Sequence, residues 1–243
     1  MLWQTILLAG GILAQNKINE PVNYPALIQN KTDTTFVIGG LFSLTQDGTD
    51  STVLSKGIQR FEAFKCAVAA LNNNNTVNGV TFEYNVQDDL GVGSTGLYKT
   101  LSFIQDGVMA VVGAGPSGVT DPVARLISTF NTPLISYASS AVPLSNLDIY
   151  STLMRTVASD EAQTKGMIAA AKQFGWSLIA AAGTLDTYGS SGLSGFVNKA
   201  ALNDVSVTCN RIISNPDSLS EVTTFGTCIK ESTAKVVMLF SKF

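Results

Sequence analysis

Residues 109–118 read MAVVGAGPSG, in which an apolar stretch leads directly into a glycine-rich loop. A strand followed by such a loop and a helix is typical of α/β proteins, and this example has two interpretations. In the first, Gly113, Gly115 and Gly118 form a G-x-G-x-x-G dinucleotide fingerprint, with a pyrophosphate at the helix N-terminus. In the second, Ser117 and the same helix N-terminus hold a smaller anion, such as the carboxylate of an amino acid.

Strand-like and helix-like segments alternate along the chain on both sides of this stretch. Apolar runs predict strands at Thr35–Phe42, Val80–Gln87, Val108–Gly113, Pro133–Tyr137, Leu153–Val157, Trp176–Gly183, Val205–Ile213 and Ala234–Phe240. The runs between them predict helices at Lys56–Asn73, Ser94–Asp106, Ser117–Phe130, Asp160–Phe174, Tyr188–Leu202 and Ser218–Ser232. This alternation predicts an α/β fold with parallel sheets flanked by helices.

A change in composition near Ala141–Asp148 divides the alternation into two sets. We expect a first lobe over residues 35–150 and a partial second lobe over residues 151–243, with the chain crossing between them near residues 142–155. The second set ends on a strand without a following helix, which predicts a truncated second lobe.

The dinucleotide interpretation makes a demand that the sequence does not meet. Such a site needs an acidic residue at the end of the next strand, where it binds the ribose. Here the next predicted strand, Pro133–Tyr137, is followed by Ala138-Ser139-Ser140. A second match to the pattern, at Gly91, Gly93 and Gly96, fails in the same way. An FAD- or NAD-dependent enzyme therefore stays only as a remote alternative.

Hydroxyl side chains follow two successive predicted strands. Ser117 comes after the strand that ends at Gly113, and Ser139 and Ser140 come after the next strand. The C-terminal ends of parallel strands converge on one crevice, where hydroxyls and free backbone N–H groups suit a carboxylate. We therefore predict Ser117, Ser139 and Ser140 as ligand-binding residues, with helix capping as the alternative role of Ser117.

The composition argues against several classes of function. The 243 residues are 45% hydrophobic and 14% charged, and a net charge of −3 leaves no basic stripe for nucleic acid. The chain has no histidine, which is the commonest general base and metal ligand. Its three cysteines form no C-x-x-C pair, which argues against a zinc site. We expect a protein that is not an enzyme and that uses no cofactor and no metal.

The beginning of the chain predicts an extracellular protein. An apolar run over residues 6–14 is too short to span a bilayer and ends in small residues, as in a signal peptide. A buried N-terminal helix is the alternative. We expect a signal peptide at residues 1–15 and a leader or linker at residues 16–34. Sequons at Asn30 and Asn74 are candidate glycosylation sites, and they fit a secreted or cell-surface location.

An ordered series of motifs runs through the chain, namely Gly39-Gly40-Leu41-Phe42, Gly57–Ala63 (GIQRFEA), Ile135–Ser140 (ISYASS), Arg155–Asp160 (RTVASD) and Tyr188–Gly192 (YGSSG). In this order the motifs resemble the extracellular ligand-binding, or Venus-flytrap, region of class C G-protein-coupled receptors, of the metabotropic glutamate receptor type. The resemblance implies a two-lobed fold like that of periplasmic binding proteins. One departure is Ala158, which stands where the family has proline.

The resemblance implies a role for each site residue. Ser117 would bind the α-carboxylate of an amino acid, and Ser140 would contact both the carboxylate and the amino group. Asp160, also placed on the first lobe, would pair with the α-ammonium group. Tyr188 would close over the ligand from the second lobe, and Arg60 would face the distal part of the ligand.

Three of these residues have structural alternatives. Asp160 and Gln163 have the spacing of a capping box, which would make Asp160 a helix start and not a ligand contact. Tyr188 is alternatively a packed aromatic residue with an exposed hydroxyl. The alternative for Arg60 is a solvated surface charge.

The cysteines depart from the family pattern. The two that form the family's first-lobe disulfide are absent, and Leu90 stands at the second position. Cys209 lies where the family often has a cysteine bonded to a following module, and a pair with Cys228 is the alternative within this chain. Cys66 would then remain as a free, half-buried thiol, with an intermolecular disulfide as the alternative.

The family resemblance leads to an expected function. We expect an extracellular receptor domain that binds a small amino-acid-like ligand between two lobes and signals by lobe closure. The resemblance further implies a homodimer through the first lobe and a membrane-spanning signalling domain in a full-length relative. A secreted or periplasmic-type solute-binding protein without a signalling domain is the main alternative.

Overall fold

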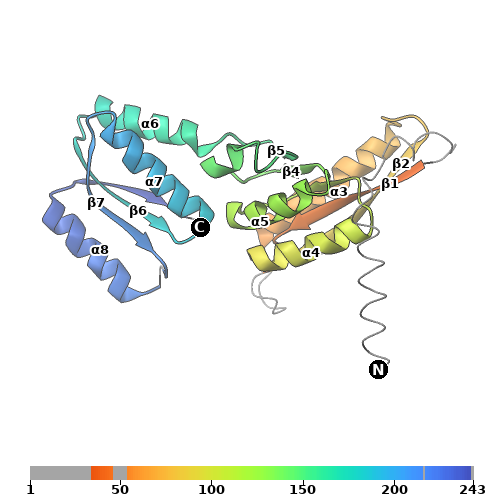
Figure 1. The fold of residues 1–243 in the computed structure, drawn as a ribbon, viewed down its shortest axis with the longest axis horizontal. Helices are drawn as coiled ribbons and strands as arrows, with labels where there is room; N and C mark the ends of the chain where they lie inside the picture. Colours follow the sequence, from red (N-terminus) through yellow and green to blue (C-terminus); the bar gives the residue numbers. More distant parts are fainter. Residues whose placement is uncertain (1–33, 46–53, 216, 242–243) are drawn as a thin grey trace, which may run out of the picture.

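The computed structural model describes residues 34–45, 54–215 and 217–241. The expected signal peptide, the leader as far as residue 33 and the Asn30 sequon lie outside these residues. Within them the chain forms two parallel sheets that lie side by side, each with its own helices (Figure 1). The predicted α/β fold with two helix-flanked parallel sheets is confirmed.

The first sheet has five parallel strands in the order β2-β1-β3-β4-β5. These strands are β1 (Thr34–Phe42), β2 (Val80–Asp88), β3 (Ala110–Val112), β4 (Leu134–Ser136) and β5 (Leu153–Arg155). The helices that connect them are α3 (Ser55–Asn73), α4 (Gly93–Gln105) and α5 (Ser117–Ser128), and the short 3-10 helix η1 (Val142–Ser145) precedes β5.

The helices of this lobe cover both faces of the sheet, because the strands carry apolar side chains on both sides. On one face Leu41, Val111 and Leu134 pack into the core with residues of α4 and α5 such as Phe103 and Val119. On the other face a smaller cluster joins strand and α3 residues, among them Phe42, Phe64, Val68, Phe82 and Val86.

The second sheet has three parallel strands, in the order β7-β6-β8. It contains β6 (Leu178–Thr184), β7 (Ser206–Ile213) and β8 (Val236–Phe240), with helices α6 (Asp160–Gln173), α7 (Thr187–Ala201) and α8 (Leu219–Ser232). The central strand β6 is buried on both sides. Ile179 and Ala181 face the core with α6 and α7, while Ala180 and Ala182 pack towards Phe225 of α8.

The strand β5 belongs to the first sheet, although the expected boundary placed residues 151–243 in the second lobe. Leu153 pairs with Leu134 of β4, and Leu153 and Tyr150 are part of the first core. The change of lobe therefore follows β5 and comes at the start of α6, whose Ile168 and Ala171 pack in the second core. Composition could not show this, because strand pairing depends on register across the sheet.

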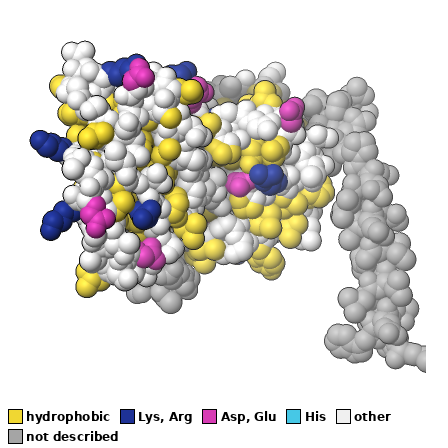
Figure 2. All heavy atoms as spheres, turned by 60° about the vertical axis from the view of Figure 1, so that its left-hand side comes forward, with side chains coloured by type: hydrophobic (Ala, Val, Ile, Leu, Met, Phe, Trp, Pro, Cys, Tyr) yellow, Lys and Arg dark blue, Asp and Glu magenta, His cyan; other side chains and the backbone are white. Residues whose placement is uncertain are grey.

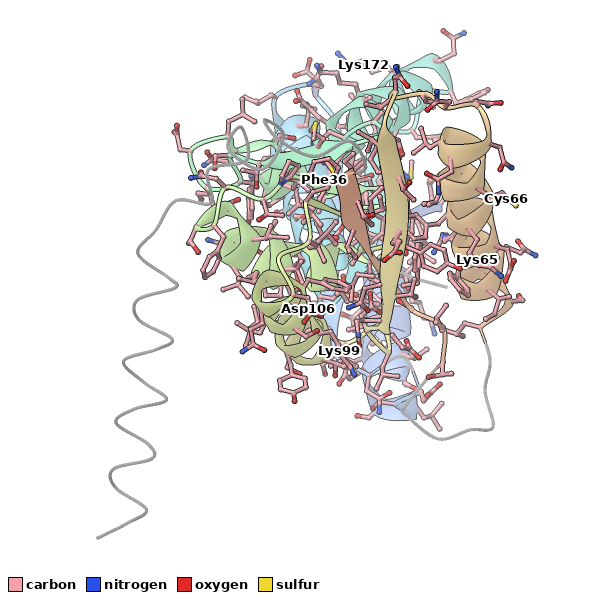
Figure 3. The ribbon with its side chains drawn as sticks, turned by 90° about the vertical axis from the view of Figure 1, so that its right-hand side faces the viewer. Phe36, Lys65, Cys66, Lys99, Asp106 and Lys172 are labelled. Atoms are coloured by element: carbon pink, nitrogen blue, oxygen red, sulfur yellow. A yellow bond between two sulfur atoms is a disulfide. The ribbon has the colours of Figure 1, made fainter. Side chains whose placement is uncertain are left out.

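The three cysteines have different environments. Cys209 of β7 and Cys228 of α8 form a disulfide with a Cα–Cα distance of 5.9 Å, which attaches the helix to the sheet. Cys66 is a free thiol on α3, and its side chain is exposed (Figure 3). The expectation of a half-buried Cys66 is therefore wrong, because the apolar side of α3 presents Phe64 and Val68 to the sheet instead.

The surface seen in Figure 2 carries acidic and basic side chains interspersed among apolar and neutral ones. None of the helices that the structure describes has the length and hydrophobicity needed to cross a membrane.

Two glycines of each G-x-G-x-x-G match allow close packing, namely Gly93 and Gly96 in one and Gly113 and Gly115 in the other. Gly113 has a φ of 148°, and a Cβ there would collide with the carbonyl oxygen of Leu41 on β1. In α4, a Cβ on Gly93 would lie 2.7 Å from the backbone oxygen of Gly118 at the start of α5. The missing side chains thus allow the loop to lie against β1 and α4 to lie against α5.

This packing predicts that Gly93→Ala destabilises the protein by about 1–3 kcal/mol, because the added methyl group meets a backbone carbonyl that cannot move without α5. Urea unfolding followed by circular dichroism would measure the change. Gly166→Ala in α6 is the matched control, because nothing lies within 4 Å of its Cβ position. That variant should gain about 0.5–1 kcal/mol from helix propensity. Equal effects at the two positions would contradict the packing role of Gly93.

Candidate functional site

Ser117 is the first residue of α5 and is buried, with 4% of its surface exposed. Its hydroxyl accepts a hydrogen bond from the Ala141 N–H at 3.3 Å. The residue at the cap position is Pro116, which makes no side-chain cap bond. Ser117 therefore does not cap the helix. The Val119 and Thr120 N–H groups donate to the Pro116 carbonyl, whereas the Ser117 and Gly118 N–H groups before them have no side-chain cap among the described residues. This combination of donors suits an anion.

The hydroxyls of Ser136 and Ser139 are engaged within the first lobe. Ser139 is fully buried, its oxygen lies 2.6 Å from that of Thr120, and it donates to the Gly115 carbonyl at 2.9 Å. Ser136 donates to the Ala114 carbonyl at 2.7 Å and accepts from the Ser139 N–H at 3.1 Å. Both residues thereby hold the glycine loop in place, and the Ser139 hydroxyl is bonded to this loop and to Thr120.

Asp160 is the first residue of α6, and its N–H donates to the Ser140 carbonyl at 2.8 Å. The cap of α6 is Ser159, whose hydroxyl accepts from the Glu161 N–H. The capping role considered for Asp160 is thus filled by its neighbour. The family resemblance led us to expect Asp160 on the first lobe. Because α6 packs on the second sheet, Asp160 instead stands at the start of the second lobe.

Asp160 is 5% exposed as a residue, and its Oδ2 atom has no hydrogen-bond partner in the part of the chain that the structure describes. Burial raises its pKa above the usual value, because the charged form loses hydration. A hydrogen bond from the Ser140 side chain and the positive charge of Arg155 act in the opposite direction. A buried carboxylate oxygen without a partner is costly unless a ligand supplies one.

Tyr188 comes from the first turn of α7, which Asp186 caps by accepting from the N–H groups of Tyr188 and Gly189 at 2.9 Å each. The ring is half-buried, and burial raises the pKa of its hydroxyl. The Asp160 charge raises it further, while a hydrogen bond with the Gln163 side chain lowers it. The structure therefore places the Tyr188 hydroxyl close to Gln163 and within electrostatic reach of Asp160.

The first turns of α5 and α7 face one another across the junction between the lobes. A Cβ built on Gly118 would lie 3.9 Å from the Thr187 hydroxyl. Ser117 and Tyr188, the neighbours of these two residues, therefore lie on opposite sides of the same junction. This arrangement places the first turn of α5, with the Ser117 hydroxyl, opposite the first turn of α7, with Tyr188.

Arg60 approaches the same loop from α3. Its side chain is exposed, and the guanidinium lies over the ring of Tyr137, 5.0 Å from the ring centre. A Cβ on Gly115 would lie 3.2 Å from Arg60 Nη1. The residue is therefore neither a free surface charge nor part of the Asp160 cluster, but a cation stacked beside the glycine loop.

Arg155 was not among the residues predicted from the sequence. It ends β5, and its guanidinium donates to the carbonyls of Ser139 and Ala141 and to the Ser145 hydroxyl. Its motif was visible in the sequence, but these contacts depend on the β4–β5 register, which pairs Arg155 with Ser136.

Two further features lie away from this junction. An open groove runs between α3 and the edge strand β2, and its lining contains none of the predicted ligand residues. Asn74, the candidate glycosylation site within the described residues, is exposed at the end of α3.

The internal role of Ser139 predicts that Ser139→Ala lowers the free energy of unfolding by about 1–2 kcal/mol, because partners in the buried loop lose a hydrogen bond. Chemical denaturation would measure this change. Ser194→Ala on the exposed side of α7 removes a hydroxyl that bonds only to its own helix, and should change stability little. An unchanged midpoint for Ser139→Ala would show that the bonds of this hydroxyl are dispensable.

Comparison with known proteins identifies relatives of the chain. A family model described as the receptor family ligand binding region matches residues 59–243. The extracellular calcium-sensing receptors of Mus musculus and Homo sapiens are each 29% identical over 206 residues, which cover 76% of this chain and 19% of each receptor. Metabotropic glutamate receptor 4 of Mus musculus is 27% identical over 222 residues, covering 79% of this chain and 24% of the receptor. The chain thus spans about a fifth to a quarter of the length of these relatives.

Proposed function

The chain belongs to the receptor family ligand-binding region, in the form that class C G-protein-coupled receptors carry, and we propose that it binds an α-amino acid between its two lobes. The observation that carries the proposal is the buried Asp160 Oδ2 atom without a protein hydrogen-bond partner among the described residues. An α-ammonium group would supply both the missing hydrogen bond and a compensating charge.

The opposite end of the ligand would be a carboxylate at the start of α5. There the Ser117 hydroxyl and the first backbone N–H groups of the helix lie together, and the helix dipole favours negative charge. Ser140, whose carbonyl is bonded to the Asp160 N–H, would contact both the carboxylate and the ammonium group. A zwitterion therefore matches the charge distribution better than a simple anion or cation.

Tyr188 would complete the site from the second lobe. Because it projects from α7 beside Asp160, closure of the lobes would bring its hydroxyl and ring over the ligand. The free energy of ligand binding would then favour the closed arrangement, and a full-length receptor would transmit this preference to its membrane domain. The proposed location is accordingly the extracellular side of the plasma membrane. The relatives are receptors, which favours a binding function over catalysis.

This proposal predicts that one or more of the twenty amino acids bind to the purified chain in calorimetric titration. Asp160→Asn and Ser117→Ala should each weaken that binding at least tenfold, because each removes one charged or hydrogen-bonded end of the zwitterion. The N-acetylated form of the same amino acid, which lacks the ammonium group, should not bind.

Asp148→Asn is the control for Asp160→Asn, because Asp148 is exposed and lies outside the site. Binding that survives both Asp160→Asn and Ser117→Ala would place the ligand elsewhere on the protein.

We further propose that the chain forms a homodimer through the first lobe. Tyr98 and Leu101 lie three residues apart on the outer side of α4 and are 71% and 43% exposed. Large apolar side chains that share an exposed helix face are typical of contact surfaces.

The dimer proposal predicts that Tyr98→Glu combined with Leu101→Glu shifts the chain to monomer in sedimentation velocity, because charges would be buried in the interface. Leu202→Glu, which changes an 85% exposed leucine on the second lobe, should leave the distribution unchanged. A wild-type chain that remains monomeric at high concentration would rule out a stable dimer on this face.

A further inference from the structure

Arg155 connects three points of the segment that carries Ser140. Nη1 lies 3.4 Å from the Ser139 carbonyl oxygen and 3.2 Å from that of Ala141, and Nη2 lies 2.6 Å from the Ser145 hydroxyl. The planar guanidinium therefore fixes both ends of residues 139–145 with a single rigid group.

The position of Arg155 follows from the sheet. β5 pairs with β4 in parallel, with Arg155 opposite Ser136, so the arginine side chain stands beside the segment that leaves β4. The chain then leads within five residues to Asp160. The side chain thus contacts residues 139–145, and the residue stands five positions before the start of α6.

The charge of Arg155 also acts on Asp160. Burial lowers the pKa of Arg155 and the Asp160 carboxylate raises it, while the arginine charge in turn lowers the pKa of Asp160. The other groups that act here are polar or acidic: the Ser140 hydroxyl bonds to Asp160, the Tyr188 hydroxyl lies near it, and Asp186 and Gln163 lie near Tyr188. Arg155 is the cation that acts on Asp160 within the described residues.

We propose that Arg155 is a positioning residue of the ligand site, which holds residues 139–145 in place beside the start of α6 without touching the ligand. The bracing depends on the planar guanidinium of the side chain, whereas its electrostatic effect on Asp160 depends on its charge. The importance of both for amino-acid binding rests on the proposed function.

The test uses the ligand-free chain. Carbon-13 NMR would follow the titration of the Asp160 carboxyl, assigned by its absence in Asp160→Asn, and hydrogen exchange would follow the amides of residues 139–145. Arg155→Gln should raise the Asp160 pKa, because a nearby positive charge is lost, and should speed exchange about tenfold. Arg155→Lys keeps the charge but loses the planar guanidinium, so it should speed exchange with little change in that pKa.

Arg211→Gln is the matched control, because Arg211 is exposed and bonds only to the neighbouring Asn210 carbonyl. It should leave both measurements at their wild-type values. An Arg155→Gln variant with a wild-type Asp160 titration and wild-type exchange would overturn the proposal, as would an Arg155→Lys variant that matches wild type in exchange. If Arg155→Gln does not fold, Arg155→Lys and Ser145→Ala test the bracing, since Ser145→Ala should speed exchange in this segment alone.

Because no ligand enters these measurements, their outcome is separate from that of the amino-acid titrations. A chain that binds none of the twenty amino acids but shows the expected NMR and exchange changes would overturn the proposed function and retain the role of Arg155.

Discussion

The geometry of the site depends on the missing side chain at Gly113. With a φ of 148° and no Cβ, this residue lets the loop after β3 lie against the Leu41 carbonyl of β1. The Ser136 and Ser139 hydroxyls then bind the carbonyls of Ala114 and Gly115 and hold the loop there. These loop contacts therefore fix the position of the start of α5 and of Ser117, which the helix alone would not determine.

A second set of contacts joins the two lobes. The Asp160 N–H bonds to the Ser140 carbonyl, so the start of α6 is attached to the segment that follows β4. Arg155 braces the same segment and supplies the positive charge that opposes the effect of burial on Asp160. A buried carboxylate with one unpartnered oxygen is thus maintained at the junction, where its desolvation cost can be offset by a bound cationic group.

The sequence predicted the order and type of the helices and strands well, because periodic apolar runs separated by glycine and polar turns are local signals. It also selected Ser117, Asp160 and Tyr188, which lie in the first turns of α5, α6 and α7; their role in ligand binding stays a prediction. It did not predict that the Ser139 hydroxyl forms hydrogen bonds within the first lobe, because its partner Thr120 lies nineteen residues away. Nor did it predict the contacts of Arg155, which require the β4–β5 register.

By itself the sequence determined the α/β class, the family and the kinds of side chain available for a ligand, since these follow from local patterns and ordered motifs. Only the tertiary structure decided that β5 completes the first sheet, that Asp160 begins the second lobe, and that the glycines of the loop serve packing. The physical reason is that pairing register, burial and close approach depend on residues distant in the chain. Local patterns carry no information about which of those residues meet.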